Sequence, residues 1–444
     1  MVDGWTKLAY RLAIPGLALV VFGVFAALWV GGFQAAYMGL LRAVGIDPFL
    51  FPFVDAHAVL SAAECHRQGV DVYATNPCDV LGRPHAYSPL WLSIIPHWLG
   101  TTDLTGVGLF LDLAFIASLG AVFRPQSPRE VVPYALAAVS PIVMFAVERC
   151  NIDLIIFLVV VAAAKLWNSA PRARLAAYSV CLGAALLKYY PIVLLAFVAR
   201  ERLRRGAVIA FAVTSVLLLF GWHYREQIGP ALANIPKLSP FADAFSALNL
   251  PYGISSLVEG DAGRHPNLLA TLLMAGLITV CLLLVRQNIA RLSRLPIDCT
   301  GWEMRCLAFA AVLLPACFFA AQNMAYRGVF LLLLVPGLMR LRQAAIANPA
   351  MCRWLGLMLA ATYFALWEPC LLHLAHALAD VNESAAIRLW LVLWFIRELV
   401  WWWLIAGCLA IAVMALGSLP LTGQIMSLKQ RLWSHLGHAE QPTL

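Results

Sequence analysis

The chain has 444 residues, of which 62% are apolar and 12% are charged, and its mean hydropathy is +0.81. One soluble core cannot bury so much apolar surface, so the composition excludes a soluble protein and predicts an all-α polytopic membrane protein. The net charge of +8 does not indicate nucleic-acid binding. The arginines stand in short clusters between apolar runs, as they do in the cytoplasmic loops of membrane proteins.

The chain begins with a charged stretch and an apolar run that continues to about Phe33. The run is too long for a signal peptide and no cleavage site follows it, so we expect a retained signal anchor with its N-terminus inside. A helix needs about 20 apolar residues to cross a membrane, and somewhat fewer inside a bundle, which predicts about twelve crossings in one membrane domain. The expected crossings are residues 13–34, 104–123, 131–147, 152–168, 174–187, 190–199, 207–222, 267–286, 304–321, 326–339, 353–374 and 387–414 of the single domain 1–444.

Residues 174–187 and 190–199 are each too short to cross alone. We predict a broken helical hairpin hinged at Lys188-Tyr189-Tyr190-Pro191, because proline removes a helix donor and restricts the residue before it. The hairpin also agrees with charge, since the arginine-bearing loops on either side of it are both expected in the cytoplasm. The expected cytoplasmic segments are residues 124–129, 172–174, 200–205, 286–294 and 340–342 and the tail 415–444, which carries Lys429 and Arg431.

This topology leaves two long loops outside, residues 35–103 and residues 223–266. In the first loop, residues 55–69 have helical periodicity with Gly69 as a stop, and residues 89–99 resemble a second short helix on the membrane surface. The second loop is expected to help cover a substrate cleft. Most polar side chains that are not in arginine clusters therefore fall on the outer face.

Turns at Asn76-Pro77 and Gly82-Arg83-Pro84 separate the two short helices of the first loop. Cys65 and Cys78 share this exported loop. They either form a disulfide, which would stabilise the loop by about 3 kcal/mol, or remain free thiols. No Cys/His spacing or acidic cluster suggests a metal site, so neither a metal nor another cofactor is expected.

Asp55 lies near the membrane surface, about twenty residues after the first apolar run. In a low dielectric a carboxylate is harder to ionise and is a stronger base, so Asp55 can serve as a general base. The alternative is an N-cap of the helix that follows, since aspartate is a favoured cap. His57 and His66 are more simply read as amphipathic side chains at the interface.

Lys188 and Arg327 are cations on the outer face, against the usual charge bias, and each stands beside tyrosines at the end of an apolar run. An ammonium and a guanidinium both neutralise phosphoryl oxygens well, so a lipid-phosphate pocket is one explanation. The other is snorkelling of each side chain to lipid head groups. Two such cations together favour the pocket.

Two further charge pairs stand in or next to apolar runs. Glu148 and Arg149 are either solvated interfacial charges or a neutralised pair. Arg397 and Glu398 fall inside the last apolar run, where charges are costly, so we expect them to face the bundle and to have a structural role.

Seven short motifs together carry a family resemblance. They are Val54-Asp55; Gly69-Val70-Asp71-Val72-Tyr73; Asn76-Pro77-Cys78-Asp79 with Gly82-Arg83-Pro84; Tyr87-Ser88-Pro89; Arg149-Cys150-Asn151; Leu187-Lys188-Tyr189-Tyr190-Pro191; and Asn323 to Arg327 before an apolar run. The combination resembles the GT-C superfamily of membrane glycosyltransferases. Within it, the chain is similar to glycosyltransferase family 87, which includes polyprenyl-phosphomannose-dependent mannosyltransferases.

The resemblance implies a GT-C-like fold and an inverting enzyme. The enzyme would move a hexose such as mannose from a polyprenyl-phosphate donor to a lipid or glycan acceptor, on the outer side of the bacterial cytoplasmic membrane. It further implies that Asp55 is the general base, and that Lys188 and Arg327, with Arg149, stabilise the departing lipid phosphate. The residues implied to line the substrate cleft are His57, Tyr87, Glu148, Asn151, Tyr189, Tyr190, Asn323 and Tyr326.

Two other functions fit parts of the sequence. A transporter or lipid flippase also uses broken helices and charges inside the membrane. Against it, the chain has no repeated half, and Asp55 lies in a surface loop rather than at the membrane midplane. A non-catalytic scaffold for other envelope enzymes is the third possibility.

Overall fold

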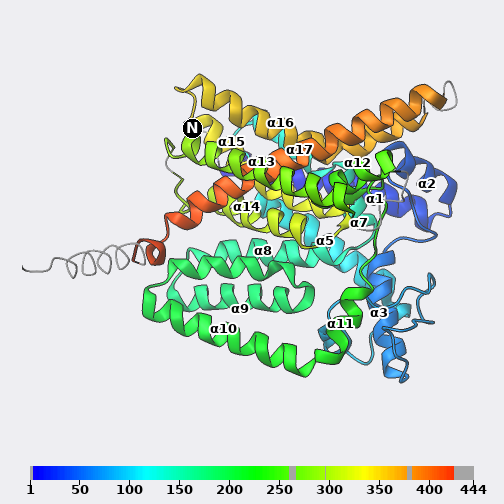
Figure 1. The fold of residues 1–444 in the computed structure, drawn as a ribbon. Coiled ribbons are helices and arrows are strands. Elements are labelled where there is room, and N and C mark those ends of the chain that lie inside the picture. The colour runs from blue at the N-terminus through cyan, green and yellow to red at the C-terminus, as the bar shows by residue number, and fades with distance from the viewer. Residues whose placement is uncertain (1–3, 260–266, 296, 378–382, 425–444) are drawn as a thin grey trace, which may run out of the picture.

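The computed structural model describes residues 4–259, 267–295, 297–377 and 383–424. This part of the chain is a helical bundle, and its one sheet is an antiparallel pair of two-residue strands (Figure 1). The strands are β1 (Ala244–Phe245) and β2 (Asn323–Met324), with Ala244 opposite Met324. The prediction of an all-α membrane protein is confirmed. Most of the predicted cytoplasmic tail, including Lys429 and Arg431, and residues 260–266 of the second outer loop lie outside the described residues.

Seven helices in the described part of the chain are long and apolar enough to cross a membrane. Each coincides with a predicted crossing. They are α1 (Gly4–Val30), α5 (Leu104–Val122), α10 (Leu203–His223), α13 (Leu268–Leu292), α14 (Trp302–Ala320), α16 (Pro349–Ala377) and α17 (Glu383–Gly417).

Helices α6 (Pro128–Ala138) and α7 (Pro141–Glu148) form a further apolar pair that is bent by 49°. Ser140 has an extended backbone, as expected for a residue before a proline, and this breaks the helix. Counted as one span, the pair brings the number of candidate spans in the described residues to eight.

Four predicted crossings correspond to elements that are shorter or less apolar than these. They are α8 (Ile152–Trp167), α9 (Pro171–Lys188), the 3₁₀ helix η2 (Tyr190–Arg200), and the 3₁₀ helix η3 (Ala325–Leu333) continued by α15 (Leu334–Ala344). The predicted break in the hairpin is present between α9 and η2, where Tyr189 has a φ of +54°. The second arm is a 3₁₀ helix, which the sequence did not predict.

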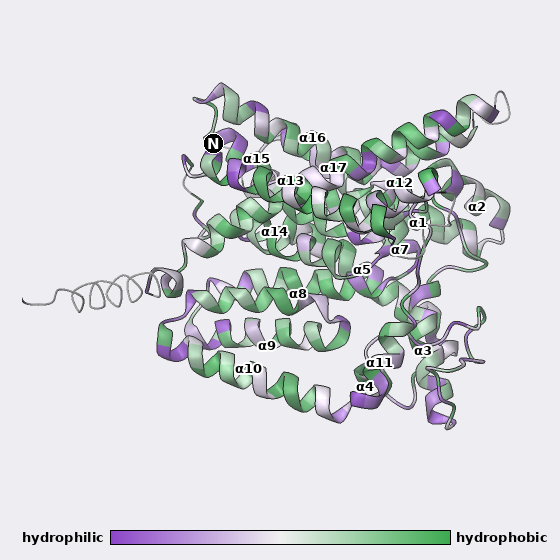
Figure 2. Cartoon of the chain, in the orientation of Figure 1, coloured by the Kyte–Doolittle hydropathy of each residue, from purple (hydrophilic) through white to green (hydrophobic). Residues whose placement is uncertain are grey.

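Apolar side chains cover both the interior and much of the outside of the bundle. Phe157, Phe309 and Phe330 belong to one continuous buried core. Phe211 on α10 and Leu272 on α13 are exposed, as they would be towards lipid. Figure 2 shows hydrophobic colouring along the helices and hydrophilic colouring concentrated near their ends.

The first outer loop contains α2 (Gln34–Ala43), α3 (Val54–Arg67), α4 (Leu90–Ile94) and the 3₁₀ turn η1 (Thr101–Asp103). The predicted helix over 55–69 is confirmed, and Gly69 follows it with a φ of +81°. The second predicted helix is shorter than 89–99, because Ile95 is extended before Pro96 and ends it. Helix α2 was not predicted.

The two outer loops meet at one end of the bundle. The second loop contributes α11 (Arg225–Ala233) and α12 (Asn249–Glu259). Figure 1 shows α3 and α11 together at that end. At the far end of α9 from Lys188, Arg174 and Arg205 both form ion pairs with Glu201. The two arginine-rich loops of the hairpin therefore lie together, as predicted.

Candidate functional site

A cavity of about 390 Å³ lies between the first outer loop and the bundle. It brings together segments that are more than two hundred residues apart in the sequence. The residues predicted for the site that line it are Asp55, Tyr87, Arg149, Lys188, Tyr189, Asn323, Tyr326 and Arg327. The candidate site consists of this cavity and the side chains that hold its walls.

Asp55 lies in the first turn of α3 and is largely buried. Phe53 occupies the N-cap position and no side chain caps the helix, so the alternative reading of Asp55 as an N-cap is wrong. Its Oδ2 accepts a hydrogen bond of 2.6 Å from Asn151 Nδ2, and its backbone N–H donates to the Arg149 carbonyl at 3.1 Å. The bond from Asn151 orients the carboxylate, and the backbone bond holds the start of α3, so Asp55 is fixed in the lining of the cavity.

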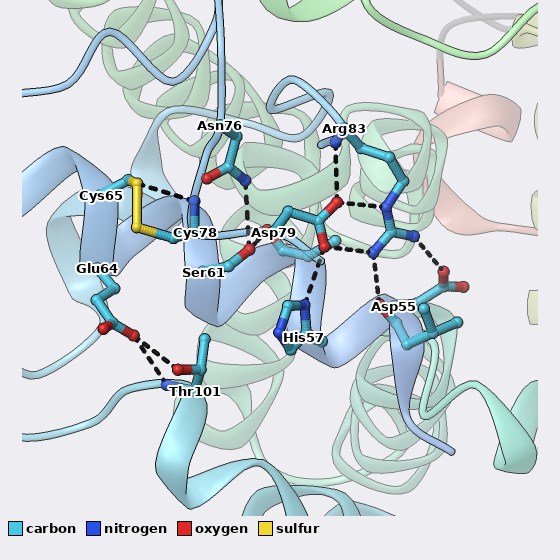
Figure 3. Close-up of polar contacts among 12 residues, drawn as sticks. Asp55, His57, Ser61, Glu64, Cys65, Asn76, Cys78, Asp79, Arg83 and Thr101 are labelled. Atoms are coloured by element: carbon cyan, nitrogen blue, oxygen red, sulfur yellow. Dashed lines mark hydrogen bonds and ion pairs between the residues drawn. A yellow bond between two sulfur atoms is a disulfide. The ribbon is translucent and has the colours of Figure 1, made fainter. Parts of the chain in front are cut away.

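Arg83 is a cavity residue that sequence reasoning did not assign to the site. Its Nε and Nη2 donate to the two oxygens of Asp79 at 2.7 and 3.0 Å, and Nη2 also donates to the Val54 carbonyl at 2.8 Å. Nη1 lies 3.7 Å from Asp55 Oδ1. Figure 3 shows this fork of contacts. The Gly82-Arg83-Pro84 turn was the signal that could have identified it.

Asp79 is the anchor of this network. His57 does not line the cavity, and its Nδ1 lies 2.9 Å from Asp79 Oδ1, so the interfacial reading of this histidine is wrong. Burial opposes ionisation of Asp79, but the hydrogen bonds from His57 and Arg83 hold its pKa well below the usual range. Asp79 is therefore ionised and orients Arg83 towards Asp55.

A disulfide joins Cys65 and Cys78, whose Cα atoms are 5.8 Å apart (Figure 3). It ties the end of α3 to the turn immediately before Asp79. Nearby, Asn76 Nδ2 donates to Ser61 Oγ at 3.3 Å. The segment that leads into Asp79 and Arg83 is thus fastened to α3 at two points.

Another part of the cavity lining carries two buried cations that share one carboxylate. Lys188 Nζ lies 2.8 Å from Asp153 Oδ1, and Arg327 Nε lies 3.7 Å from Asp153 Oδ2. Both cations are largely buried and point at this carboxylate, so they do not snorkel to lipid head groups. Among the described residues, these two cations form ion pairs with one carboxylate, so the cluster has a net positive charge of one.

Asp153 is the second residue that sequence reasoning missed. It is fully buried at the start of α8, and Tyr190 donates a hydrogen bond of 2.5 Å to its Oδ1. The signal in the sequence was an isolated carboxylate at the head of an apolar run, which is costly unless a partner is present.

Asn151 and Tyr190 were predicted for the cleft but lie behind its wall. Asn151 connects the two sides of the site, because its Nδ2 donates to Asp55 and its Oδ1 accepts from Lys188 Nζ at 3.2 Å. The acid and the nearest cation are therefore separated by one amide group.

Glu148 and Arg149 form a neutralised pair rather than two solvated charges. Arg149 Nε lies 3.6 Å from Glu148 Oε2, and both side chains are buried. Arg149 lines the cavity, and its guanidinium lies 4.0 Å from the ring centre of Phe49. Glu148 faces a different cavity, so its predicted place in the cleft is wrong.

The backbone is strained at three points around the site. Among the described residues other than glycine, positive φ angles occur at Phe53 (+66°), Cys150 (+44°) and Tyr189 (+54°). These residues stand two before Asp55, directly after Arg149, and directly after Lys188. Such conformations cost about 1–3 kcal/mol each and gather at functional sites. The strain therefore supports assigning this cavity as the site.

The described part of the second outer loop contributes to the cavity, through Asn234, Ile235, Pro236 and Leu238. Asn234 Nδ2 donates to the carbonyls of Tyr73 and His85 at 2.8 and 3.2 Å. Burial lowers the pKa of the His85 ring to about 4, so this ring is uncharged at neutral pH.

Arg397 and Glu398 face the bundle, as predicted. Arg397 lies 2.8 Å from Glu398 and 3.4 Å from Glu368, and its Nη2 donates to the Ala242 carbonyl at 3.2 Å. This cluster holds the chain just before β1, whose partner strand β2 begins with the cavity residue Asn323. Its role is to position one wall of the site.

Within the described residues, no group of three or more His, Cys, Asp or Glu side chains is arranged to hold a metal ion. Comparison with protein-family models found no matching family, and searches of curated proteins and of solved structures found no match. The chemistry of the cavity has to be inferred from its own residues.

Proposed function

We propose that the protein is an inverting glycosyltransferase that moves a sugar from a polyprenyl-phosphate donor to a hydroxyl of a lipid or glycan acceptor. The observation that carries the proposal is that Asp55 and the cation pair Lys188 and Arg327 line the same cavity. Such a reaction needs a base for the incoming hydroxyl and positive charge for the outgoing phosphate.

In the proposed reaction, the acceptor hydroxyl donates to Asp55 Oδ1, because Oδ2 is already bonded to Asn151. Asp55 takes the proton as the acceptor oxygen attacks the anomeric carbon. The bond from that carbon to the phosphate oxygen breaks, and the phosphate leaves on its lipid. Arg83 lies beside the Asp55 carboxylate and keeps it oriented towards the cavity.

The departing phosphate carries the negative charge that the cavity lining lacks around Lys188 and Arg327. Lys188 and Arg327 share only Asp153, so one positive charge is free to neutralise a phosphoryl oxygen. Arg149 adds a further guanidinium on the same cavity. Because these groups are buried, the charge acts in a water-poor site, where it stabilises a transition state more strongly than in water.

The finer topology belongs to the same proposal. Twelve crossings in a GT-C arrangement would place both ends of the chain in the cytoplasm, and the cavity at the periplasmic or extracellular face of a bacterial cytoplasmic membrane. The elements α8, α9, η2 and η3 with α15 would then cross inside the bundle, where neighbouring helices relax the length requirement. Labelling of a single cysteine at position 188 from the outside tests this directly, and labelling only from the cytoplasm would contradict it.

The decisive test replaces Asp55 with asparagine. Asp55→Asn keeps the size and the bond from Asn151 but cannot accept the proton, so transfer should fall by roughly 10²- to 10⁴-fold. The measurement is sugar transfer by purified protein from a polyprenyl-phosphate sugar, together with donor binding, which should be retained.

Asp71→Asn is the matched control. Asp71 is an exposed aspartate of the same loop whose side chain only accepts from the Tyr73 N–H. Normal turnover in Asp55→Asn would refute the mechanism. A transporter or flippase would instead show lipid translocation in vesicles and no transfer in detergent with any donor.

A further inference from the structure

A second cavity, of about 210 Å³, lies among α1, α2, α5 and α7. Apolar side chains form most of its wall, among them Phe22, Phe25 and Trp29 of α1. Several of its lining residues, such as Val30 and Leu113, are also exposed on the outside of the bundle. The cavity is thus apolar and open towards the lipid side of the protein.

Two carboxyl groups line this apolar cavity, Asp112 of α5 and Glu148 of α7. The residues are only 6% and 8% exposed. Glu148 Oε1 accepts a bond of 3.4 Å from Tyr37, whereas Glu148 Oε2 and Asp112 Oδ1 have no hydrogen-bond partner among the residues that the structure describes. Buried polar atoms are almost always paired, and leaving them unpaired costs about 1–3 kcal/mol each.

The two carboxyl groups also differ in their ion pairing. Arg149 lies 3.6 Å from Glu148 and forms its ion pair. Asp112 forms no ion pair with any described residue. The apolar cavity therefore presents two carboxyl groups, and only Glu148 has a guanidinium beside it.

We propose that this cavity binds a membrane lipid whose head group carries a primary ammonium. The ammonium would donate to the carboxyl groups of Asp112 and Glu148 and pair with the carboxyl that has no guanidinium beside it, while an alkyl chain lies along the aromatic face of α1. A cavity of about 150 Å³ can hold a benzene ring, so this one has room for the ammonium and part of a chain. An anionic head group would be repelled, and a quaternary ammonium has no N–H to donate.

The site is separate from the cleft but shares a wall with it. Phe53 N–H donates to the Glu148 carbonyl at 2.7 Å, and Asp55 N–H donates to the Arg149 carbonyl at 3.1 Å. Phe53 and Glu148 face the lipid cavity, whereas Asp55 and Arg149 face the cleft. Lipid binding is measured without any transfer assay, so the inference does not depend on the proposed reaction.

The test titrates delipidated, detergent-purified protein with lipids of identical chains and counts bound lipids by native mass spectrometry. The three lipids are phosphatidylethanolamine, its N-trimethylated counterpart phosphatidylcholine, and phosphatidylglycerol. Phosphatidylethanolamine should bind roughly tenfold more tightly than the other two lipids, because losing a hydrogen bond between charged groups weakens binding by about this factor. Equal binding of the three lipids, or a preference for phosphatidylglycerol, would overturn the proposal.

Two variants locate the site. Asp112→Asn removes the carboxyl group without changing size, and should abolish the preference for phosphatidylethanolamine. Asp103→Asn, outside the cavity, should leave the preference unchanged.

Gly23→Leu places a side chain in the cavity, because nothing lies within 4 Å of a Cβ at Gly23. Gly16→Leu is its control, on the same helix with equally open space but away from the cavity.

An unchanged preference in Asp112→Asn would overturn the assignment of the site. If a variant fails to fold, as judged by its thermal unfolding in detergent, the comparison of the three lipids on the unaltered protein still decides whether a primary ammonium is recognised.

Discussion

Asp55 and Lys188 face the same cavity, but their surroundings differ. Asp55 belongs to a loop side, made of α3 and the turn at Asp79 and Arg83, which has a small core and is fastened by a disulfide and side-chain hydrogen bonds. Lys188 belongs to a bundle side, where large apolar side chains surround one buried carboxylate, Asp153. On the loop side, a disulfide and side-chain hydrogen bonds hold Asp55 and its neighbours at the surface of the bundle. On the bundle side, the charged groups are buried in the apolar core.

The largest loss of stability is expected at Asp153, the buried carboxylate of the bundle side. Asp153→Asn leaves Lys188 and Arg327 buried without their shared carboxylate, and removing one partner of a buried ion pair destabilises a protein by about 3–5 kcal/mol. The free energy of unfolding in detergent measures this. Asp298→Asn, at an exposed aspartate, should change it by less than about 0.5 kcal/mol. Equal stability of the two variants would show that the bundle side does not depend on its buried charge.

The loop side should depend on its disulfide instead. Replacing Cys65 and Cys78 with serine opens a link between residues 13 apart in sequence, which should destabilise the loop by about 3 kcal/mol. Hydrogen exchange should rise in residues 54–92 and stay unchanged in α14, which belongs to the bundle core. Cys352→Ser, at a free cysteine, is the control. Faster exchange throughout the chain would mean that the two sides unfold as one unit.

His85 gives the loop side a dependence on pH. Its pKa is lowered to about 4 from an ordinary value of 6.5, so the folded state binds fewer protons than the unfolded state between these values. Stability is therefore complete above about pH 6.5 and falls as the pH drops towards 4, by up to about 3 kcal/mol. His85→Gln should flatten this slope, measured as loop unfolding between pH 7.5 and 4.5. An unchanged slope in His85→Gln would assign the acid sensitivity to another group.

The sequence predicted the apolar helices and the break at Pro191, because hydrophobic run length and proline geometry are local properties. It also pointed to Asp55, Lys188 and Arg327, since each is a charge in an unusual place. Arg83, Asp79 and Asp153 could not be assigned in the same way.

The roles of these three residues come from partners brought close by the fold, and no local pattern shows which carboxylate a given cation will meet. Glu148 was misplaced for a similar reason. It is next to Arg149 in the sequence, but consecutive residues at the end of α7 face two different cavities.

The smallest expected effect tests whether the loop side needs the shape of Arg83 or only its charge. Arg83 spreads its contacts over Asp79, the Val54 carbonyl and Asp55, as a planar fork can. Arg83→Lys keeps the charge but cannot hold both Asp79 and Asp55, so transfer should fall roughly tenfold, equivalent to about 1.4 kcal/mol.

The matched control is Arg67→Lys, which alters a guanidinium of the same loop that contacts only the Leu99 carbonyl among its hydrogen bonds. The readouts are the transfer rate and the unfolding midpoint of each variant. A lower rate with an unchanged midpoint in Arg83→Lys would mean that the fork positions Asp55 for reaction. If both variants lose stability alike and Arg83→Lys loses no additional rate, Arg83 is only a structural tie of the loop, and Asp55 must be positioned from the bundle side through Asn151 alone.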